Sequence, residues 1–175
     1  MRILIAYDSK TGTAKECAQK LANQFSQHDT ELCNIREEKK NVSEYDFVVI
    51  GGSVRFGGLS KILKRFLSEV GEDLKDRGHA FFICCCESDE AEEYIKRGFP
   101  KELRDSAVIS ENFGGELRPE RHKGLERLFV KIARKNSMKT DDINYPNEIK
   151  TPPAILPETI SYFADRIKES FGEKQ

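Results

Sequence analysis

The stretch RILIAYDSKTGTAKECAQKLANQF, residues 2–25, decides the fold of this 175-residue chain. Its residues 3–6 are continuously apolar, as in a parallel strand that is covered on both faces. From about Thr13 the apolar residues recur at intervals of three and four, which predicts an amphipathic helix. A buried strand that runs through a short polar loop into a helix is the first half of a parallel α/β unit.

The same alternation continues along the chain. Further strands are expected over residues 31–36, 47–50, 80–86 and 107–109, and the strand at 47–50 is expected to break at Gly51-Gly52. Helices are expected over residues 59–70 and 157–171, with a short acidic helix around residues 91–95. Five strands that alternate with helices predict an α/β fold, a doubly wound five-stranded parallel sheet in three layers.

Composition excludes several classes of protein. The hydrophobic fraction is 38% and no apolar run approaches the roughly 20 residues of a membrane span, so we expect no spanning helix. The N-terminus turns polar too soon for a signal peptide. Five cysteines, three of them adjacent at residues 84–86, form neither a disulfide framework nor a zinc spacing. We therefore expect a cytoplasmic protein with a single domain over residues 1–175 and no metal site.

Charge is unevenly distributed although the net charge is only −1. Residues 118–139 hold eight Lys or Arg against two Glu, a local net charge of 8 − 2 = +6, while residues 87–93 are acidic. We expect residues 118–153 to form a basic helical insertion before the last helix, with an amphipathic helix over 121–135. That helix could contact an anionic membrane, bind carboxylates or simply pack on the sheet. Nucleic-acid binding is not expected, because exposed aromatics and overall basicity are missing.

The loop after the first strand is Ser9-Lys10-Thr11-Gly12-Thr13, and Ala14 follows it. It offers hydroxyls, a glycine and the backbone N–H groups of a helix N-terminus, which together suit a phosphate. The Gly-Lys-Ser/Thr ending of a P-loop is missing. The hydroxyls could also serve only as helix caps. Ligands in such sheets bind beyond the carboxyl ends of the strands, so the position favours a phosphate site.

A second candidate loop follows the third strand and contains Ser53, Val54, Arg55, Phe56 and Gly57. Glycines on both sides would let the backbone approach a flat ring, and Phe56 could stack on it. Arg55 is our catalytic candidate, because its charge would stabilise a reduced, anionic ring. The alternative is a glycine-rich turn with an exposed arginine.

A third candidate loop, at the end of the fourth strand, contains Cys86 and Glu87. Neighbouring side chains of a strand point to opposite faces, and cysteine is among the most buried residue types. We expect Cys84 to pack in the core and Cys86 to lie near a bound ring.

With these loops in place, the sequence resembles the flavodoxin family, whose phosphate loop follows the pattern Ser/Thr-x-Thr-Gly-x-Thr. Ser9, Thr11 and Gly12 match this pattern, while Ala14 stands where the last threonine is usual. The resemblance implies a flavodoxin-like fold and an FMN cofactor. Ala14 removes one hydroxyl, so it motivates a third possibility, a regulatory domain that has lost its cofactor.

The chain also resembles the flavodoxin-type, menaquinone-dependent protoporphyrinogen IX dehydrogenases and related bacterial flavodoxin-domain proteins. This resemblance rests on the loop of residues 50–57 and on residues 113–118, which precede a basic helix. It implies an FMN-dependent oxidoreductase that acts on a small redox substrate or quinone, cytoplasmic or peripheral to the inner membrane face through residues 118–139. The alternative is an electron carrier to a redox protein partner.

Overall fold

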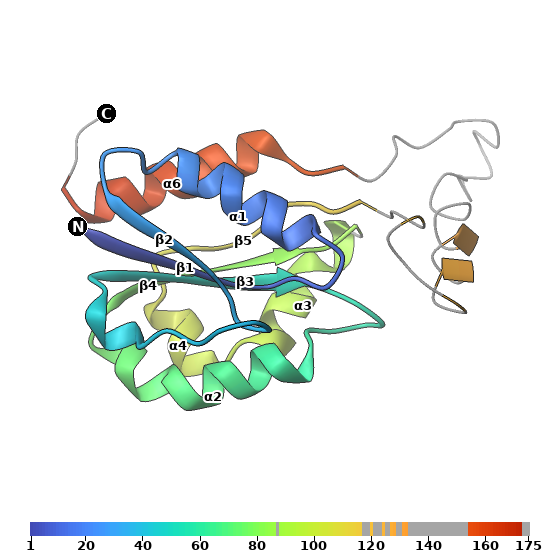
Figure 1. Cartoon of the computed structure of the whole chain (residues 1–175), viewed down its shortest axis with the longest axis horizontal. Helices are drawn as coiled ribbons and strands as arrows, with labels where there is room; N and C mark the ends of the chain where they lie inside the picture. The colour runs from blue at the N-terminus through green and yellow to red at the C-terminus, as the bar shows by residue number, and fades with distance from the viewer. Residues whose placement is uncertain are drawn as a thin grey trace.

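The computed structural model describes residues 1–86, 88–116 and 154–172, together with positions 120, 124, 127, 128, 131 and 132. Its centre is a five-stranded sheet in the order β2-β1-β3-β4-β5, and every neighbouring pair is parallel (Figure 1). The strands are β1 (Arg2–Asp8), β2 (Asp29–Asn34), β3 (Phe47–Ser53), β4 (Gly78–Cys84) and β5 (Ser110–Asn112). The predicted doubly wound parallel sheet is confirmed.

Helices cover both faces of the sheet and make three layers (Figure 1). One face packs against α1 (Thr13–Asn23) and α6 (Pro157–Ser170). The other face packs against α2 (Lys61–Lys75), α3 (Ala91–Gly98) and α4 (Lys101–Ser106). Two single turns, η1 (Val42–Glu44) and η2 (Ser88–Glu90), complete the described elements.

The apolar run of residues 3–6 has a direct structural explanation. Leu4 and Ala6 belong to the core cluster under α2, whereas Ile3 and Ile5 belong to the cluster under α1 and α6. All four side chains are fully buried. A strand that is covered on both faces cannot alternate apolar and polar residues, which is why this strand was predictable.

The structure corrects several predicted boundaries. β3 does not break at Gly51 but stays paired with β4 as far as Ser53. The ring of Phe82 in β4 would lie 2.3 Å from a Cβ at position 51, so only glycine fits there. β5 covers Ser110–Asn112, beyond the expected residues 107–109. β4 covers Gly78–Cys84 rather than 80–86, and β2 begins at Asp29 rather than at 31. Helix α4 was not predicted, since its six residues are too few for a periodic pattern.

The predicted basic insertion over residues 118–153 lies mostly outside the described residues. Leu128 and Ile132 are described, one helical turn apart, and they are 54% and 50% exposed. Their neighbours Arg127 and Lys131 are exposed as well. Within the described parts of the chain, no helix is long and apolar enough to cross a membrane.

Candidate functional site at the carboxyl edge of the sheet

The three predicted loops leave the same edge of the sheet. Strands β1, β3 and β4 end side by side, with Asp8 beside Gly52 and Ser53 beside Cys84. The chain passes from β1 outward to β2 and then returns to β3 on the other side of β1. The carboxyl ends of β1 and β3 therefore form the topological switch point, where sheets of this kind bind their ligands.

The first loop is shaped as an anion-binding turn. Gly12 caps α1 with φ 96°, a left-handed conformation that glycine adopts without strain. The Oγ of Ser9 accepts hydrogen bonds from the backbone N–H groups of Gly12 (3.1 Å) and Lys15 (3.3 Å). The N–H groups at the start of a helix have no partner within the helix and lie at its positive end, so the start of α1 fits a phosphate beside the two N–H groups that donate to Ser9.

Side chains of the first loop divide between surface and core. Lys10 is exposed, and Ser9 and Thr11 are partly exposed. Thr13 and Ala14 are buried, at 6% and 0% exposure. Ala14 packs in the core cluster under α1, so position 14 offers the loop only its backbone N–H group.

The second loop is a tight hairpin turn. The N–H of Arg55 donates to the carbonyl of Gly58 (2.9 Å), and the N–H of Gly58 donates to the carbonyl of Arg55 (3.2 Å). Phe56 and Gly57 both have positive φ, 49° and 81°, as in a type I′ turn. Left-handed backbone is unfavourable for a phenylalanine, by roughly 1–2 kcal/mol. The turn holds the Phe56 side chain 82% exposed at the carboxyl edge.

The glycines of this loop serve different purposes. Around Gly57 and Gly58 a Cβ would meet no atom within 4 Å, so the space beside the turn is open to a flat ring. Gly51 and Gly52 do not offer such space, because Phe82 fills one position and Asp8 and Leu63 crowd the other. The expectation that glycines on both sides of the loop admit a ring is wrong for the first pair.

A charge cluster lies beneath the second loop. The buried carboxylate of Asp8, 4% exposed, forms an ion pair with the guanidinium of Arg36. Burial lowers the pKa of Arg55, repulsion from Arg36 lowers it further, and Asp8 opposes the shift. One carboxylate and two guanidinium groups give this cluster a net charge of +1. Neither Asp8 nor Arg36 was predicted as a site residue. Asp8 could have been found, because an acidic residue at the end of an apolar strand lies at the carboxyl edge of the sheet.

The third loop is anchored by Asn112 of β5. The Asn112 Oδ1 accepts hydrogen bonds from the N–H groups of Cys85 (2.9 Å) and Gly114 (3.0 Å), and its Nδ2 donates to the Cys85 carbonyl (3.2 Å). Cys86 is half-buried at the edge, close enough that a Cβ on Gly115 would lie 3.1 Å from its Sγ. Sequence reasoning missed Asn112, which no motif marks. Glu87 lies outside the described residues.

Cys84 packs in the core as predicted, at 3% exposure. A hydrogen bond with Cys17 of α1, together with burial, raises the pKa of the Cys84 thiol. Such a thiol is inert at neutral pH. Among residues 1–86, 88–116 and 154–172, no three His, Cys, Asp or Glu side chains are grouped so that they could hold a metal ion.

Comparison with known proteins gives a family match and curated relatives from Escherichia coli. The family model described as Flavodoxin domain matches residues 4–144. Protoporphyrinogen IX dehydrogenase [quinone] of Escherichia coli K12 is 25% identical over 150 residues, which cover 78% of this chain and 81% of that protein.

Solved structures show the same fold at low identity. Oxidised flavodoxin 1 from Bacillus cereus aligns with a TM-score of 0.53 and 13% identity, over 97% of this chain and 98% of that one. A flavodoxin from the domain Archaea aligns with a TM-score of 0.51 and 18% identity, over 77% of this chain and 98% of that one.

Proposed function

This chain belongs to the flavodoxin domain family, and from that membership we propose that it binds FMN at the carboxyl edge and acts as an FMN-dependent oxidoreductase. The observation that carries the proposal is the meeting of an anion-binding turn, an outward-held aromatic ring and a cationic cluster at the switch point. The turn suits the phosphate of FMN, and the aromatic ring suits the flat flavin ring. The cationic cluster suits the negative charge that this ring gains on reduction.

We assign the phosphate to residues 9–14, with Ser9 holding the turn closed and the start of α1 supplying N–H donors. The flat ring would lie against residues 53–57, where the space beside Gly57 and Gly58 is open. Phe56 supplies an aromatic surface. Cys86, just after β4, belongs to the proposed set as well, and so does Glu87 on sequence grounds.

When bound, FMN would supply one- and two-electron redox chemistry. The protein itself would bind the cofactor, orient it and place fixed charge beside it. Arg55 carries that charge, and Asp8 and Arg36 set its surroundings. A net positive cluster at a site that gains negative charge stabilises that charge electrostatically.

For the reaction, we propose a small organic reductant and a quinone acceptor. Support comes from the relative that is named for protoporphyrinogen IX and a quinone and that aligns over most of both chains. Exposed Leu128 and Ile132 beside Arg127 and Lys131 suit contact with an anionic membrane surface, where quinones dissolve. We therefore place the protein in the cytoplasm, peripheral to the inner membrane face.

An electron carrier to a protein partner is the second candidate. Acidic side chains on η2 and α3 are exposed near the same edge and would suit docking to a basic partner: Asp89, Glu90, Glu92 and Glu93. A carrier of this kind needs the FMN site but no site for an organic substrate.

Anaerobic stopped-flow mixing separates these candidates. The FMN-loaded protein is mixed with protoporphyrinogen IX, and flavin absorbance is followed before and after addition of a menaquinone analogue. The oxidoreductase predicts bleaching by the porphyrinogen and recovery with the quinone. FMN binding without any bleaching would overturn the enzyme and favour the carrier, and failure to bind FMN would overturn both.

A further inference from the structure

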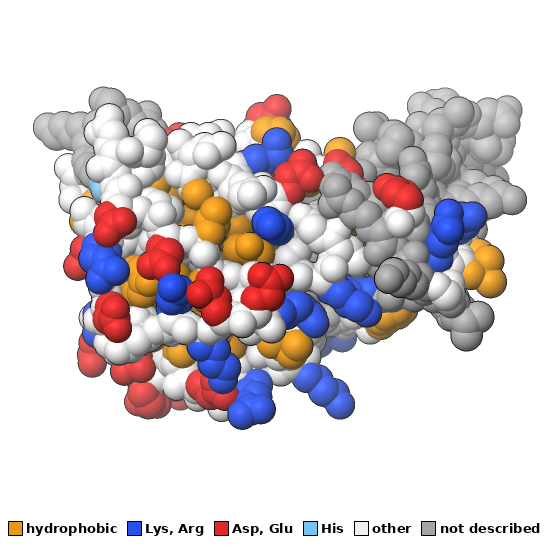
Figure 2. All heavy atoms as spheres, in the orientation of Figure 1, with side chains coloured by type: hydrophobic (Ala, Val, Ile, Leu, Met, Phe, Trp, Pro, Cys, Tyr) orange, Lys and Arg blue, Asp and Glu red, His pale blue; other side chains and the backbone are white. Residues whose placement is uncertain are grey.

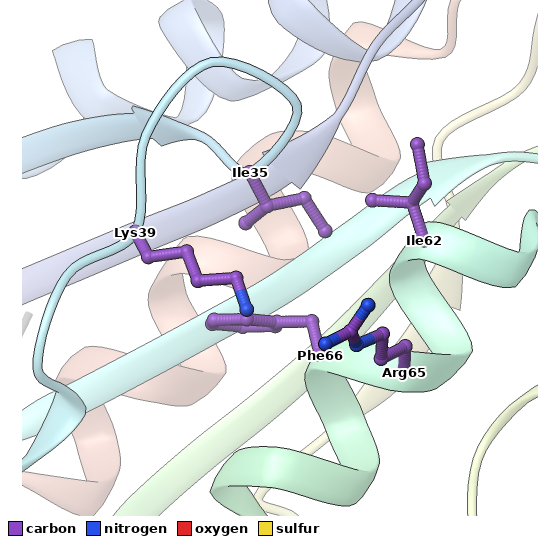
Figure 3. Close-up of a pocket in the computed structure, with 5 residues that line it drawn as sticks. All are labelled: Ile35, Lys39, Ile62, Arg65 and Phe66. Atoms are coloured by element: carbon purple, nitrogen blue, oxygen red, sulfur yellow. The ribbon is translucent and has the colours of Figure 1, made fainter.

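A small pocket lies between the turn that follows β2 and the first two turns of α2 (Figure 3). Its volume is about 160 Å³, and we call it the α2 pocket. It is lined by Ile35, Lys39, Ile62, Arg65 and Phe66. None of these residues belongs to the loops that we assign to FMN.

The pocket has apolar walls of unequal exposure. Ile35 and Phe66 are almost fully buried, at 5% and 3% exposure, whereas Ile62 is 41% exposed. An isoleucine that is left open to solvent beside a buried aromatic ring offers apolar surface to a ligand. The volume is close to that of an engineered cavity of about 150 Å³ that takes up benzene, so one ring or a short aliphatic chain fits.

The polar side of the pocket carries excess positive charge. Lys39 Nζ lies 2.5 Å from one carboxylate oxygen of Glu69, and Arg65 Nε lies 2.8 Å from the other. Two cations share one carboxylate, which leaves a local charge of +1. Figure 3 shows Lys39 reaching from the turn after β2 toward α2, which carries Arg65 and Phe66. Both side chains are more than half exposed, so they can turn toward a second anion.

Residues around the α2 pocket add to its positive charge. The first turn of α2 contains no acidic residue, and Lys61 and Lys64 are exposed there. Figure 2 shows Lys and Arg side chains gathered over the start of α2, with hydrophobic atoms exposed between them. Several cations around a small apolar hollow select an anion that carries an apolar group, rather than a neutral ligand or a free inorganic ion.

We propose that the α2 pocket binds a small apolar carboxylate, with its ring or chain against Ile62 and Phe66 and its carboxylate on Lys39 and Arg65. The site is separate from the proposed FMN site and does not depend on it. Glu69 competes with the ligand for the two cations, so the affinity depends on Glu69 as well.

The probe is benzoate, and benzyl alcohol is its neutral match of nearly equal size. Amide shifts of the ¹⁵N-labelled full chain are followed by NMR at constant ionic strength. We expect saturable shifts around Ile62 and Phe66 with a Kd on the order of 1 mM, usual for so few heavy atoms. Benzyl alcohol should bind at least about threefold more weakly. Equal affinities, or no shifts at about 20 mM benzoate, would overturn the proposal.

Four variants test the assigned contacts. Ile62→Asp places an anion in the first turn of α2, where the helix dipole favours it, so the protein should stay folded and benzoate binding should fall about tenfold or more. Lys39→Gln should weaken binding about two- to fivefold. Lys101→Gln is its matched control, because Lys101 is also exposed and paired with an acid. Glu69→Gln frees both cations and should tighten binding about twofold.

The pattern across these variants decides the outcome. The site would be established if the affinity for benzoate falls in Ile62→Asp and Lys39→Gln, stays the same in Lys101→Gln and rises in Glu69→Gln. Equal losses with Lys39→Gln and Lys101→Gln would mean diffuse attraction to the whole surface. Unchanged or weaker binding with Glu69→Gln would mean that the carboxylate does not use these cations. Each of the last two results overturns the proposal.

Discussion

The guanidinium of Arg36, two residues beyond the end of β2, is paired with the buried carboxylate of Asp8, the last residue of β1. The pair joins the carboxyl ends of two neighbouring strands. Burial is the main cause that lowers the pKa of Arg55, and the pair adds repulsion from Arg36 and attraction from Asp8. A pair far from the second loop in sequence therefore influences the charge of Arg55 in that loop.

Asp8→Asn should destabilise the protein by about 2–4 kcal/mol, because it leaves two guanidinium groups with no carboxylate between them. Urea unfolding measures this loss. Asp29→Asn is the matched control, since Asp29 also pairs with an arginine, Arg2, but on an exposed surface. The control should change the free energy of unfolding by less than about 1 kcal/mol. Similar losses for both variants would contradict the role of Asp8.

Phe56→Asn should have opposite effects on folding and on binding. Asparagine tolerates left-handed backbone, so the free energy of unfolding without FMN should rise by about 1 kcal/mol. FMN affinity should fall about fivefold with the loss of an aromatic surface. Phe56→Leu is the control, because it keeps the strained backbone but not the ring: it should weaken FMN binding without stabilising the fold. Unchanged FMN affinity in both variants would contradict stacking on Phe56.

Tyr45 should make stability depend on pH in the alkaline range. Its hydroxyl donates to Glu31 (2.5 Å), and burial, this hydrogen bond and the Glu31 charge raise the pKa of Tyr45 to about 12. Because the pKa is higher in the folded state, the stabilisation is complete below about pH 10 and is lost as the pH rises toward 12. Urea unfolding should show a loss of about 1–2 kcal/mol across this window.

Tyr45→Phe should remove that part of the alkaline loss. Tyr162→Phe should leave it unchanged, because Tyr162 is 54% exposed on α6. An identical alkaline profile for Tyr45→Phe and the parent protein would contradict the assignment.

The five thiols should differ in reactivity. Four of them are buried, and Cys86 is half-buried at the carboxyl edge. Burial raises the pKa of Cys33 to about 11. A thiol reagent at neutral pH should therefore modify one cysteine per chain rapidly and the other four only on unfolding. Cys86→Ala should abolish the rapid phase. A rapid phase that persists in this variant would contradict the assignment of that phase to Cys86.

The sheet could be predicted from sequence because its buried strands are short apolar runs. Residues 3–6 are covered on both faces, so composition alone indicates the strand. The position of the first loop followed as well, since a loop between the first strand and the first helix must lie at the carboxyl edge. The burial of Ala14 inside the core could not be read from a loop motif.

The contacts that organise the candidate site could not be predicted in the same way. Arg36 lies in a polar turn, and its pairing with Asp8 depends on how β2 lies beside β1. Asn112 holds the backbone of Cys85, 27 residues away in sequence. Gly51 looked like an opening for a ligand, yet Phe82 of the neighbouring strand fills it. Each of these contacts depends on how neighbouring strands pack, and a motif within one loop carries no information about that packing.

FMN should bind with its phosphate at residues 9–14, and a comparison of FMN with riboflavin tests this assignment. Both are titrated into cofactor-free protein while flavin fluorescence is followed. We expect one FMN per chain and an affinity for riboflavin at least about 100-fold weaker, because riboflavin lacks the group that receives the charge-assisted hydrogen bonds. Equal affinities for the two flavins, or no binding of FMN, would contradict a phosphate site at residues 9–14.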